Sequence, residues 1–125
     1  MTKEKALENQ LNRAMSRFEE ILQEKKTDIV RDSAILRFEF TFDVLWKTLK
    51  EQLAREKGVI WASPNDCFRE AYRVGIGDYS DQWIEVTKQR NEAVHTYKEE
   101  LAEALYEKLP EFLKLFQELA KALKK

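Results

Sequence analysis

The sequence predicts an all-α protein. Its 125 residues include only three glycines and two prolines, while leucine, glutamate, lysine and alanine are abundant, a composition typical of helical proteins. Apolar residues recur every three or four positions through most of the chain, which is the period of a helix with one buried face. We find no internal repeat, low-complexity tract or linker, so we expect residues 1–125 to form a single domain.

The first predicted helix spans about residues 3–24, and the second spans roughly residues 28–57 after a break at residues 25–28. Thr27 or Asp28 is the expected N-cap of the second helix, and Gly58 is expected to end it. The first helix has one apolar face, formed by Leu7, Leu11, Met15, Phe18 and Leu22.

The second predicted helix carries two apolar stripes, about 100° apart around its axis. Because a helix that is apolar on more than one side is buried on more than one side, we expect this helix at the centre of a bundle, in a dimer interface, or both. Its cluster of four aromatic residues is a weaker candidate for stacking on bases; packing in the core or a dimer is the favoured interpretation. The stripes are Ile35, Phe38, Phe42, Leu45, Leu49 and Leu53, and then Leu36, Phe40 and Val44; the aromatic cluster is Phe38, Phe40, Phe42 and Trp46.

Three further helices complete the predicted fold. Ser63 followed by Pro64 indicates the start of a third helix that ends near residue 74. Asp78 or Ser80 is expected to cap a fourth helix that runs toward residue 94. Thr96, with a glutamate three residues later, matches a capping box, so a fifth helix is expected to begin near residue 95, with a kink or a restart at Pro110. Its apolar face is Leu101, Leu105, Leu109, Phe112, Phe116, Leu119 and Leu123.

The candidate site is the segment 90–97 (RNEAVHTY), where the fourth predicted helix ends and the fifth begins. His95 is the only histidine, and the ordinary pKa of histidine lets it exchange protons near neutral pH. Arg90 supplies a permanent positive charge suited to a phosphate. Together these two residues predict a small phosphodiester site. The alternative is an inert histidine with Arg90 in a surface ion pair with Glu85 or Glu92.

Three further polar residues have two interpretations each. Asn91 either orients a phosphate or simply ends a helix. Glu39 and Asp43 lie four residues apart on one face of the second predicted helix. They could be partners of Arg90, but we favour two acids that face solvent or an interface.

Composition excludes several classes of function. With 22 basic and 23 acidic residues, no overall field draws the protein to nucleic acid or to anionic lipid, so any RNA binding must be local. The single Cys67 allows no internal disulfide and no zinc cluster of the usual kind. No apolar run is long enough to span a membrane, and the charged start of the chain does not match a signal peptide. We expect a cytoplasmic protein without a metal or cofactor.

The Arg-x4-His-x-Tyr pattern at a helix junction resembles the HEPN superfamily. Residues 31–42 (RDSAILRFEFTF), with Trp-Lys at 46–47 and Ala-Ser-Pro at 62–64, are similar to the family of nucleotidyltransferase substrate-binding proteins. This likeness covers nearly the whole chain. It implies an antiparallel, up-and-down bundle of four or five helices and a homodimer whose two motifs face a shared cleft. It also implies a small nucleotidyltransferase as partner, with a heterotetramer as one arrangement.

The resemblance further implies a toxin-like, metal-independent endoribonuclease controlled by that nucleotidyltransferase as antitoxin. Arg90 and His95 would be the catalytic pair, Asn91 a supporting residue, and Tyr97 the site of adenylylation. The alternative for Tyr97 is a tyrosine that packs its ring at a helix N-terminus. Lys98 departs from the pattern, since relatives often have an acid there, and this difference bears on how a partner docks. The alternative is a subunit without catalytic activity that presents substrate to the nucleotidyltransferase.

The chain does not resemble the nucleotidyltransferase itself. Those enzymes share a Gly-Ser turn followed by an Asp-x-Asp pair, and this sequence contains neither. Such carboxylates hold the metal ions that transfer of a nucleotidyl group requires.

Overall fold

The computed structural model describes residues 2–58, 63–76 and 80–123. Within these ranges the chain forms helices and no strand, which confirms the predicted all-α class. The elements, in order, are α1 (Lys3–Leu22), α2 (Asp28–Lys57), α3 (Pro64–Arg73), α4 (Gln82–Glu92), the short 3-10 turn η1 (Ala93–His95) and α5 (Glu99–Leu123).

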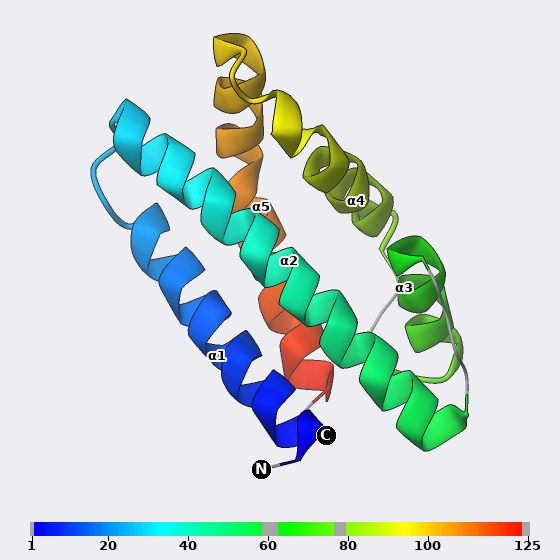
Figure 1. The fold of residues 1–125 in the computed structure, drawn as a ribbon. Helices are drawn as coiled ribbons and strands as arrows, with labels where there is room; N and C mark the ends of the chain where they lie inside the picture. The colour runs from blue at the N-terminus through cyan, green and yellow to red at the C-terminus, as the bar shows by residue number, and fades with distance from the viewer. Residues whose placement is uncertain (1, 59–62, 77–79, 124–125) are drawn as a thin grey trace.

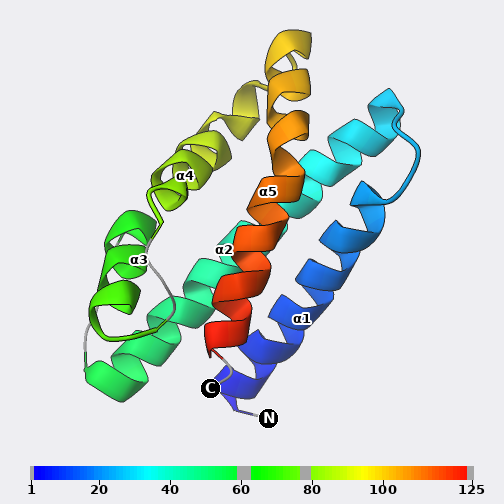
Figure 2. The ribbon, with the colours of Figure 1, turned by 180° about the vertical axis from the view of Figure 1, so that it is seen from behind.

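The helices form an antiparallel bundle around α2 (Figures 1 and 2). α1 and α5 pack on α2 and on each other, while α3 and α4 lie along the other side of α2. The first turn of α1 and the last turn of α5 lie at the same end of the molecule. No helix among the described residues is both long enough and apolar enough to cross a membrane.

Local signals account for several helix ends. The Thr27 hydroxyl accepts a hydrogen bond from the Val30 amide at 3.1 Å, and the Ser63 hydroxyl accepts one from the Asp66 amide at 3.2 Å. These bonds satisfy amide groups that have no partner within the first turn of a helix. Gly58 ends α2 with a φ of 66°, a backbone conformation that glycine adopts without steric cost.

The start of α4 differs in detail from the prediction. Asp78 lies outside the described residues. The Ser80 hydroxyl accepts a hydrogen bond from the Gln82 amide at 3.1 Å, but the residue that precedes the helix is Asp81, whose side chain makes no capping bond.

The predicted start of the fifth helix near His95 is wrong. α5 begins at Glu99, after η1 and a turn. The Thr96 hydroxyl donates a hydrogen bond back to the Ala93 carbonyl at 2.8 Å, and the Glu99 carboxylate accepts one from Arg31 at 2.7 Å. Because both side chains have other partners, the capping box does not form. At Pro110 the helix continues without a restart.

The core confirms the first apolar stripe of α2, whereas the second lies mostly at the surface of this chain. The ring of Phe38 is fully buried, with its centroid 5.6 Å from that of Phe112 and 5.9 Å from that of Phe116. Two of the three residues of the second stripe are exposed in this chain, Leu36 by 45% and Phe40 by 48%, while Val44 is half-buried against the core. The sequence predicted burial of both stripes, so the exposed residues of the second can be buried only by another molecule.

Candidate functional site

The candidate site lies on the short connection between α4 and α5. Arg90 belongs to the last turn of α4, and His95 is the last residue of η1. Between them, Ala93 is buried in the core with 5% of its surface exposed, which anchors the connection to the bundle. His95 is exposed, and its ring meets that of Tyr97 nearly edge-on, with the centroids 6.1 Å apart.

Arg90 is paired with both Glu39 and Asp43 of α2, which corrects the expectation that these two acids face solvent or an interface. Its Nε and Nη2 atoms donate to the two carboxylate oxygens of Asp43, at 3.2 and 3.0 Å. Its Nη1 atom donates to Glu39 at 3.3 Å. The alternative pairing with Glu85 does not occur, because the Glu85 carboxylate binds Lys108 at 2.8 Å.

These contacts orient Arg90 without using all of its donors. A guanidinium carries five N–H groups, and the bonds to Glu39 and Asp43 occupy three of them. The hydrogen bond to Asp43 raises the pKa of Arg90, so the group stays positive. The side chain is 25% exposed. It can therefore still donate to a ligand at the surface.

Partial burial and the ion pair with Arg90 have opposite effects on the pKa of Glu39. Desolvation raises the pKa of its carboxyl group, the charge of Arg90 lowers that pKa, and the nearby Asp43 raises it again. Desolvation is the largest of the three effects. Glu39 is thus the acid at this site that takes up a proton more readily than usual.

The structure brings together only part of the predicted set. His95 and Tyr97 are in ring contact, whereas no hydrogen bond among the described residues joins Arg90 to His95. Asn91 is exposed, as expected for either of its two interpretations. Tyr97 is 75% exposed, so its hydroxyl is accessible from solvent.

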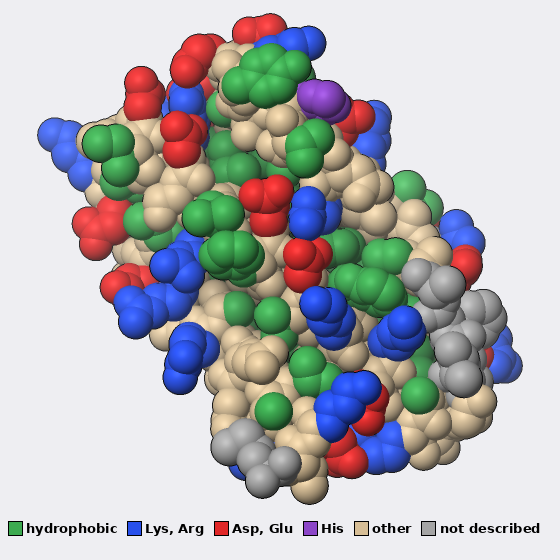
Figure 3. Space-filling view, in the orientation of Figure 1, with side chains coloured by type: hydrophobic (Ala, Val, Ile, Leu, Met, Phe, Trp, Pro, Cys, Tyr) green, Lys and Arg blue, Asp and Glu red, His purple; other side chains and the backbone are tan. Residues whose placement is uncertain are grey.

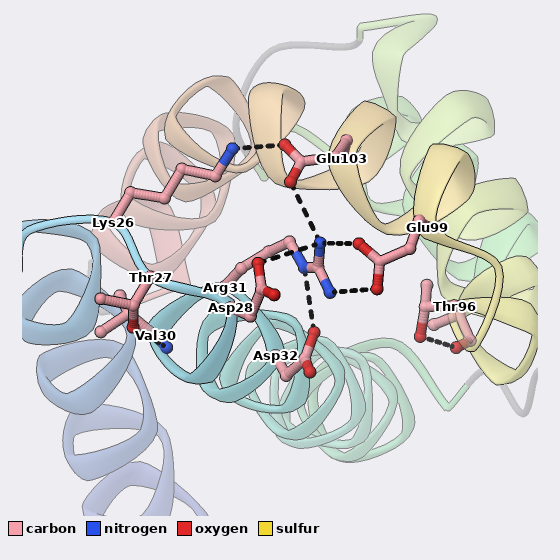
Figure 4. Close-up of polar contacts among 10 residues, drawn as sticks. Lys26, Thr27, Asp28, Val30, Arg31, Asp32, Thr96, Glu99 and Glu103 are labelled. Carbon is pink, nitrogen blue, oxygen red and sulfur yellow. Dashed lines mark hydrogen bonds and ion pairs between the residues drawn. The ribbon is translucent and has the colours of Figure 1, made fainter.

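A buried arginine next to the site was missed by the sequence reasoning. The side chain of Arg31 is 3% exposed, and it reaches from the start of α2 to the start of α5 (Figure 4). Its Nη1 atom donates to Glu99 at 2.7 Å and to Glu103 at 3.0 Å, and its Nε atom donates to Asp32 at 3.0 Å. Lys26 also binds Glu103. This cluster holds the first turn of α5 four residues after His95.

The sequence contained a signal for this cluster. Arg31 lies four residues before Ile35 and so extends the buried stripe of α2. A charge at a buried position requires paired carboxylates. The hydrogen bond to Glu99 is the main cause that raises the pKa of Arg31. In turn, Arg31 lowers the pKa of Glu99, and Lys26 and then Arg31 lower that of Glu103.

Among the described residues, this cluster contains a group of three carboxylates whose oxygens lie close enough together to be considered as metal ligands. Oxygen atoms of Asp28, Glu99 and Glu103 lie within 4.8 Å of one another. The Arg31 guanidinium lies among them, 2.7 Å from Glu99 and 3.7 Å from Asp28. The Arg31 guanidinium and the Lys26 ammonium are already the ion-pair partners of these carboxylates, so the cluster is explained as a structural ion-pair network.

The histidine shares one face of the molecule with exposed apolar side chains and with charges of both signs (Figure 3). Exposed large apolar side chains from α2 and from the α4–α5 connection include Leu36, Phe40, Val94 and Tyr97. Scattered single apolar residues are normal on a surface, but a group of them next to a polar site marks a surface for binding.

Fold and site together define a class of small helical-bundle proteins with an arginine in the last turn of the fourth helix and a histidine on the connection to the fifth. The chain belongs to the family described as nucleotidyltransferase substrate binding protein like, whose profile matches residues 6–125. It is 36% identical over 94 residues to the Haemophilus influenzae protein named "Probable ribonuclease HepT". That match spans 68% of this chain and 64% of the relative, which is less than two thirds of the relative's length.

Two solved structures share the fold. A crystal structure of a Thermus thermophilus protein matches with a TM-score of 0.84 and 32% identity, over 92% of this chain and 99% of the other. A Haemophilus influenzae protein matches with a TM-score of 0.83 and 25% identity, over 94% of this chain and 99% of the other. The latter is described as having the fold of a substrate-binding domain of a nucleotidyltransferase.

Proposed function

We propose that this protein is the helical partner of a small nucleotidyltransferase and acts as a metal-independent endoribonuclease of the HEPN type. The observation that carries the proposal is the oriented, partly exposed Arg90 at the end of α4, five residues before the exposed His95 on the same connection. The likeness to a protein named as a probable ribonuclease supports it.

In this proposal, His95 acts as the general base on a ribose 2′-hydroxyl. As the imidazole takes the proton, the 2′-oxygen attacks phosphorus and the bond from phosphorus to the 5′-oxygen breaks. The leaving 5′-oxygen takes a proton from solvent water, and the imidazolium returns its proton to solvent, which leaves a 2′,3′-cyclic phosphate and a free 5′-hydroxyl. Arg90 donates its remaining N–H groups to the phosphate oxygens and stabilises the charge that develops there. Asn91, exposed one residue further, supports the same phosphate.

The proposal extends to assembly and control. Two copies form a homodimer whose motifs face one cleft, alone or in a heterotetramer with the nucleotidyltransferase, in the cytoplasm and in a toxin–antitoxin arrangement. The nucleotidyltransferase adenylylates Tyr97, whose side chain is 75% exposed. Because the rings of Tyr97 and His95 are 6.1 Å apart between centroids, a nucleotide on Tyr97 would block access to the base.

The second candidate function is a subunit that binds substrate for the nucleotidyltransferase and performs no chemistry. The exposed apolar residues Leu36 and Phe40 favour it, because they offer a surface for another protein. The two functions differ in their need for His95. A nuclease loses its activity with His95→Ala, whereas a binding subunit tolerates that change and is weakened by Leu36→Asp.

The deciding experiment is RNA cleavage in EDTA by wild type and His95→Ala, with product ends identified by mass spectrometry. Intact mass first establishes that Tyr97 carries no nucleotide. Lys88→Ala, an exposed change on α4, is the matched control and should cleave as wild type does. Cyclic phosphate ends that disappear only in the histidine variant support the nuclease. Absence of cleavage by an unmodified, folded protein across several RNAs supports the binding subunit.

A further inference from the structure

A groove between α1 and α2 combines positive charge with an exposed aromatic ring. It is a hollow of about 420 Å³, lined on one side by Arg13 and Arg17 of α1 and on the other by Arg37, Phe40 and Val44 of α2. Phe40 is 48% exposed, and the Arg37 guanidinium carbon lies 6.0 Å from the centroid of its ring.

The arginines of this groove differ from the other arginines of the described chain. Outside the groove, every described arginine has a carboxylate within ion-pair distance; these are Arg31, Arg55, Arg69, Arg73 and Arg90. Arg13, Arg17 and Arg37 have no such partner among residues 2–58, 63–76 and 80–123. All of the arginines without a carboxylate partner in these ranges therefore line one groove.

Their spacing suits an extended anion. Arg13 and Arg17 are four residues apart on α1, so they lie on the same helix face, separated by about 6 Å along the axis. Arg37 approaches from the opposite wall. A guanidinium binds phosphate through two parallel hydrogen bonds and stacks on flat rings. The groove can thus hold consecutive phosphates while Phe40 offers a face for a base.

We propose that this groove binds a single-stranded segment of RNA, with phosphates on Arg13, Arg17 and Arg37 and a base stacked on Phe40. The proposal rests on the proposed function and deepens it, because it identifies where a substrate strand is held outside the reacting pair. The protein as a whole is nearly neutral, so binding of RNA requires a local cluster of positive charge such as this groove.

Helix α2 connects the groove to the candidate site. Phe40 follows directly after Glu39, the residue that binds Arg90 from the neighbouring side of the helix. Basic and apolar side chains lie side by side on the face that also carries the histidine (Figure 3). A strand held in the groove can therefore cross α2 and reach Arg90 within a few nucleotides. An acidic protein segment would also pair with the arginines, but its carboxylates do not stack on the ring of Phe40, whereas every nucleotide carries a base that can.

The test measures binding of a fluorescein-labelled, single-stranded oligouridylate by fluorescence anisotropy in EDTA, with His95→Ala as the parent so that the probe stays intact. The groove variant is Arg13→Gln/Arg17→Gln/Arg37→Gln. The matched control is Lys25→Gln/Lys114→Gln/Lys121→Gln, which removes the same charge from exposed positions elsewhere. Circular dichroism checks that both variants remain helical, as expected from the high helix propensity of glutamine.

We expect the groove variant to bind at least about tenfold more weakly at low salt than the parent. Each phosphate contact contributes about 0.7 to the slope of log affinity against log salt for single strands, so the slope should fall by about 2. The lysine control should keep the slope of the parent. Phe40→Ala should weaken binding by roughly five- to tenfold without changing the slope, because stacking is not ionic.

The proposal is overturned if the parent does not bind the probe, if the two triple variants lose affinity equally, or if the slope does not change. It is also overturned if labelled polyglutamate binds the groove as tightly as the RNA does, since that outcome indicates an acidic protein partner. The results distinguish failure of this proposal from failure of the proposed nuclease. If binding depends on the groove arginines but no RNA is cleaved, only the nuclease proposal is refuted. If RNA is cleaved but the groove variant binds as tightly as the parent, only the groove proposal is refuted.

Discussion

Arg90 and Asp43 form a bidentate pair: Nε and Nη2 of the arginine donate to the two carboxylate oxygens at 3.2 and 3.0 Å. Two parallel bonds fix the plane of the guanidinium as well as its position. The pair joins the end of α4 to the middle of α2, so the guanidinium that we propose binds a phosphate is held by the central helix of the bundle.

Asp43→Asn tests this orientation. An asparagine can accept only one of the two hydrogen bonds, so we expect the rate of RNA cleavage to fall by roughly tenfold while Arg90 remains present. The free energy of unfolding should change by less than about 1 kcal/mol, since a partly exposed pair contributes little to stability. Single-turnover cleavage and urea unfolding measure the two effects. Glu107→Gln, an exposed change on α5, is the control; an unchanged rate in Asp43→Asn would rule out the positioning role.

Glu39→Gln tests the raised pKa of that carboxyl group. Because the folded state holds the proton more tightly than the unfolded chain does, ionisation of Glu39 costs stability as the pH rises above its ordinary pKa of 4.5. Glutamine has no proton to lose. We expect the melting temperature of Glu39→Gln, relative to wild type, to rise between about pH 4 and about pH 7. A relative melting temperature that falls over this range would show that attraction to Arg90 outweighs desolvation.

Arg31→Met tests the cluster that holds the start of α5. Arg31 lowers the pKa of Glu99 and of Glu103, so its stabilising effect is present above their ordinary pKa of 4.5 and is lost as the pH falls through the lowered values. We expect the variant to melt at a lower temperature at neutral pH and to lose part of the acid dependence of wild type.

Hydrogen exchange in the same variant separates this local role from a general loss of stability. Residues 93–98 should exchange faster, because the turn before α5 is held through Glu99. Arg69→Met removes an arginine that pairs with Asp66 at 3.6 Å on α3, and it should leave both the acid dependence and the exchange unchanged. Equal effects of the two substitutions would contradict the role assigned to Arg31.

Phe38→Ala and Phe40→Ala compare the two sides of α2. Phe38 is fully buried against Phe112 and Phe116, so its truncation should lower the free energy of unfolding by about 3–5 kcal/mol. Phe40 is 48% exposed, and its truncation should cost less than about 1 kcal/mol in the dissociated protein. Urea unfolding at low protein concentration measures both. A large cost at Phe40 would mean that the second stripe is covered within a single chain.

Local sequence rules predicted the parts of the fold that depend on neighbouring residues. Thr27, Ser63 and Gly58 act where capping chemistry places them, and the first stripe of α2 is buried as its period requires. The second stripe has the same period but is mostly exposed, because periodicity shows that residues share a face and not what covers that face.

The errors came from contacts between distant parts of the chain. The capping box at Thr96 fails because Glu99 binds Arg31, which is 68 residues away. Glu39 and Asp43 bind Arg90 across 51 and 47 residues. No local pattern specifies such pairs; they follow from the packing of α2 against α4 and α5. The chemistry of Arg90 and His95 pointed to the site and the family resemblance assigned their roles, while the support that α2 gives Arg90 required the structure.

The most direct test of the central proposal is a double-mutant cycle on RNA cleavage with Arg90→Ala, His95→Ala and the double variant. If both residues act on the same phosphodiester, their effects are not additive, because removal of either one already abolishes the shared step. We therefore predict that the double variant cleaves no more slowly than the slower single variant, with every protein still folded. Additive losses, or full activity in either single variant, would contradict a joint catalytic role for Arg90 and His95.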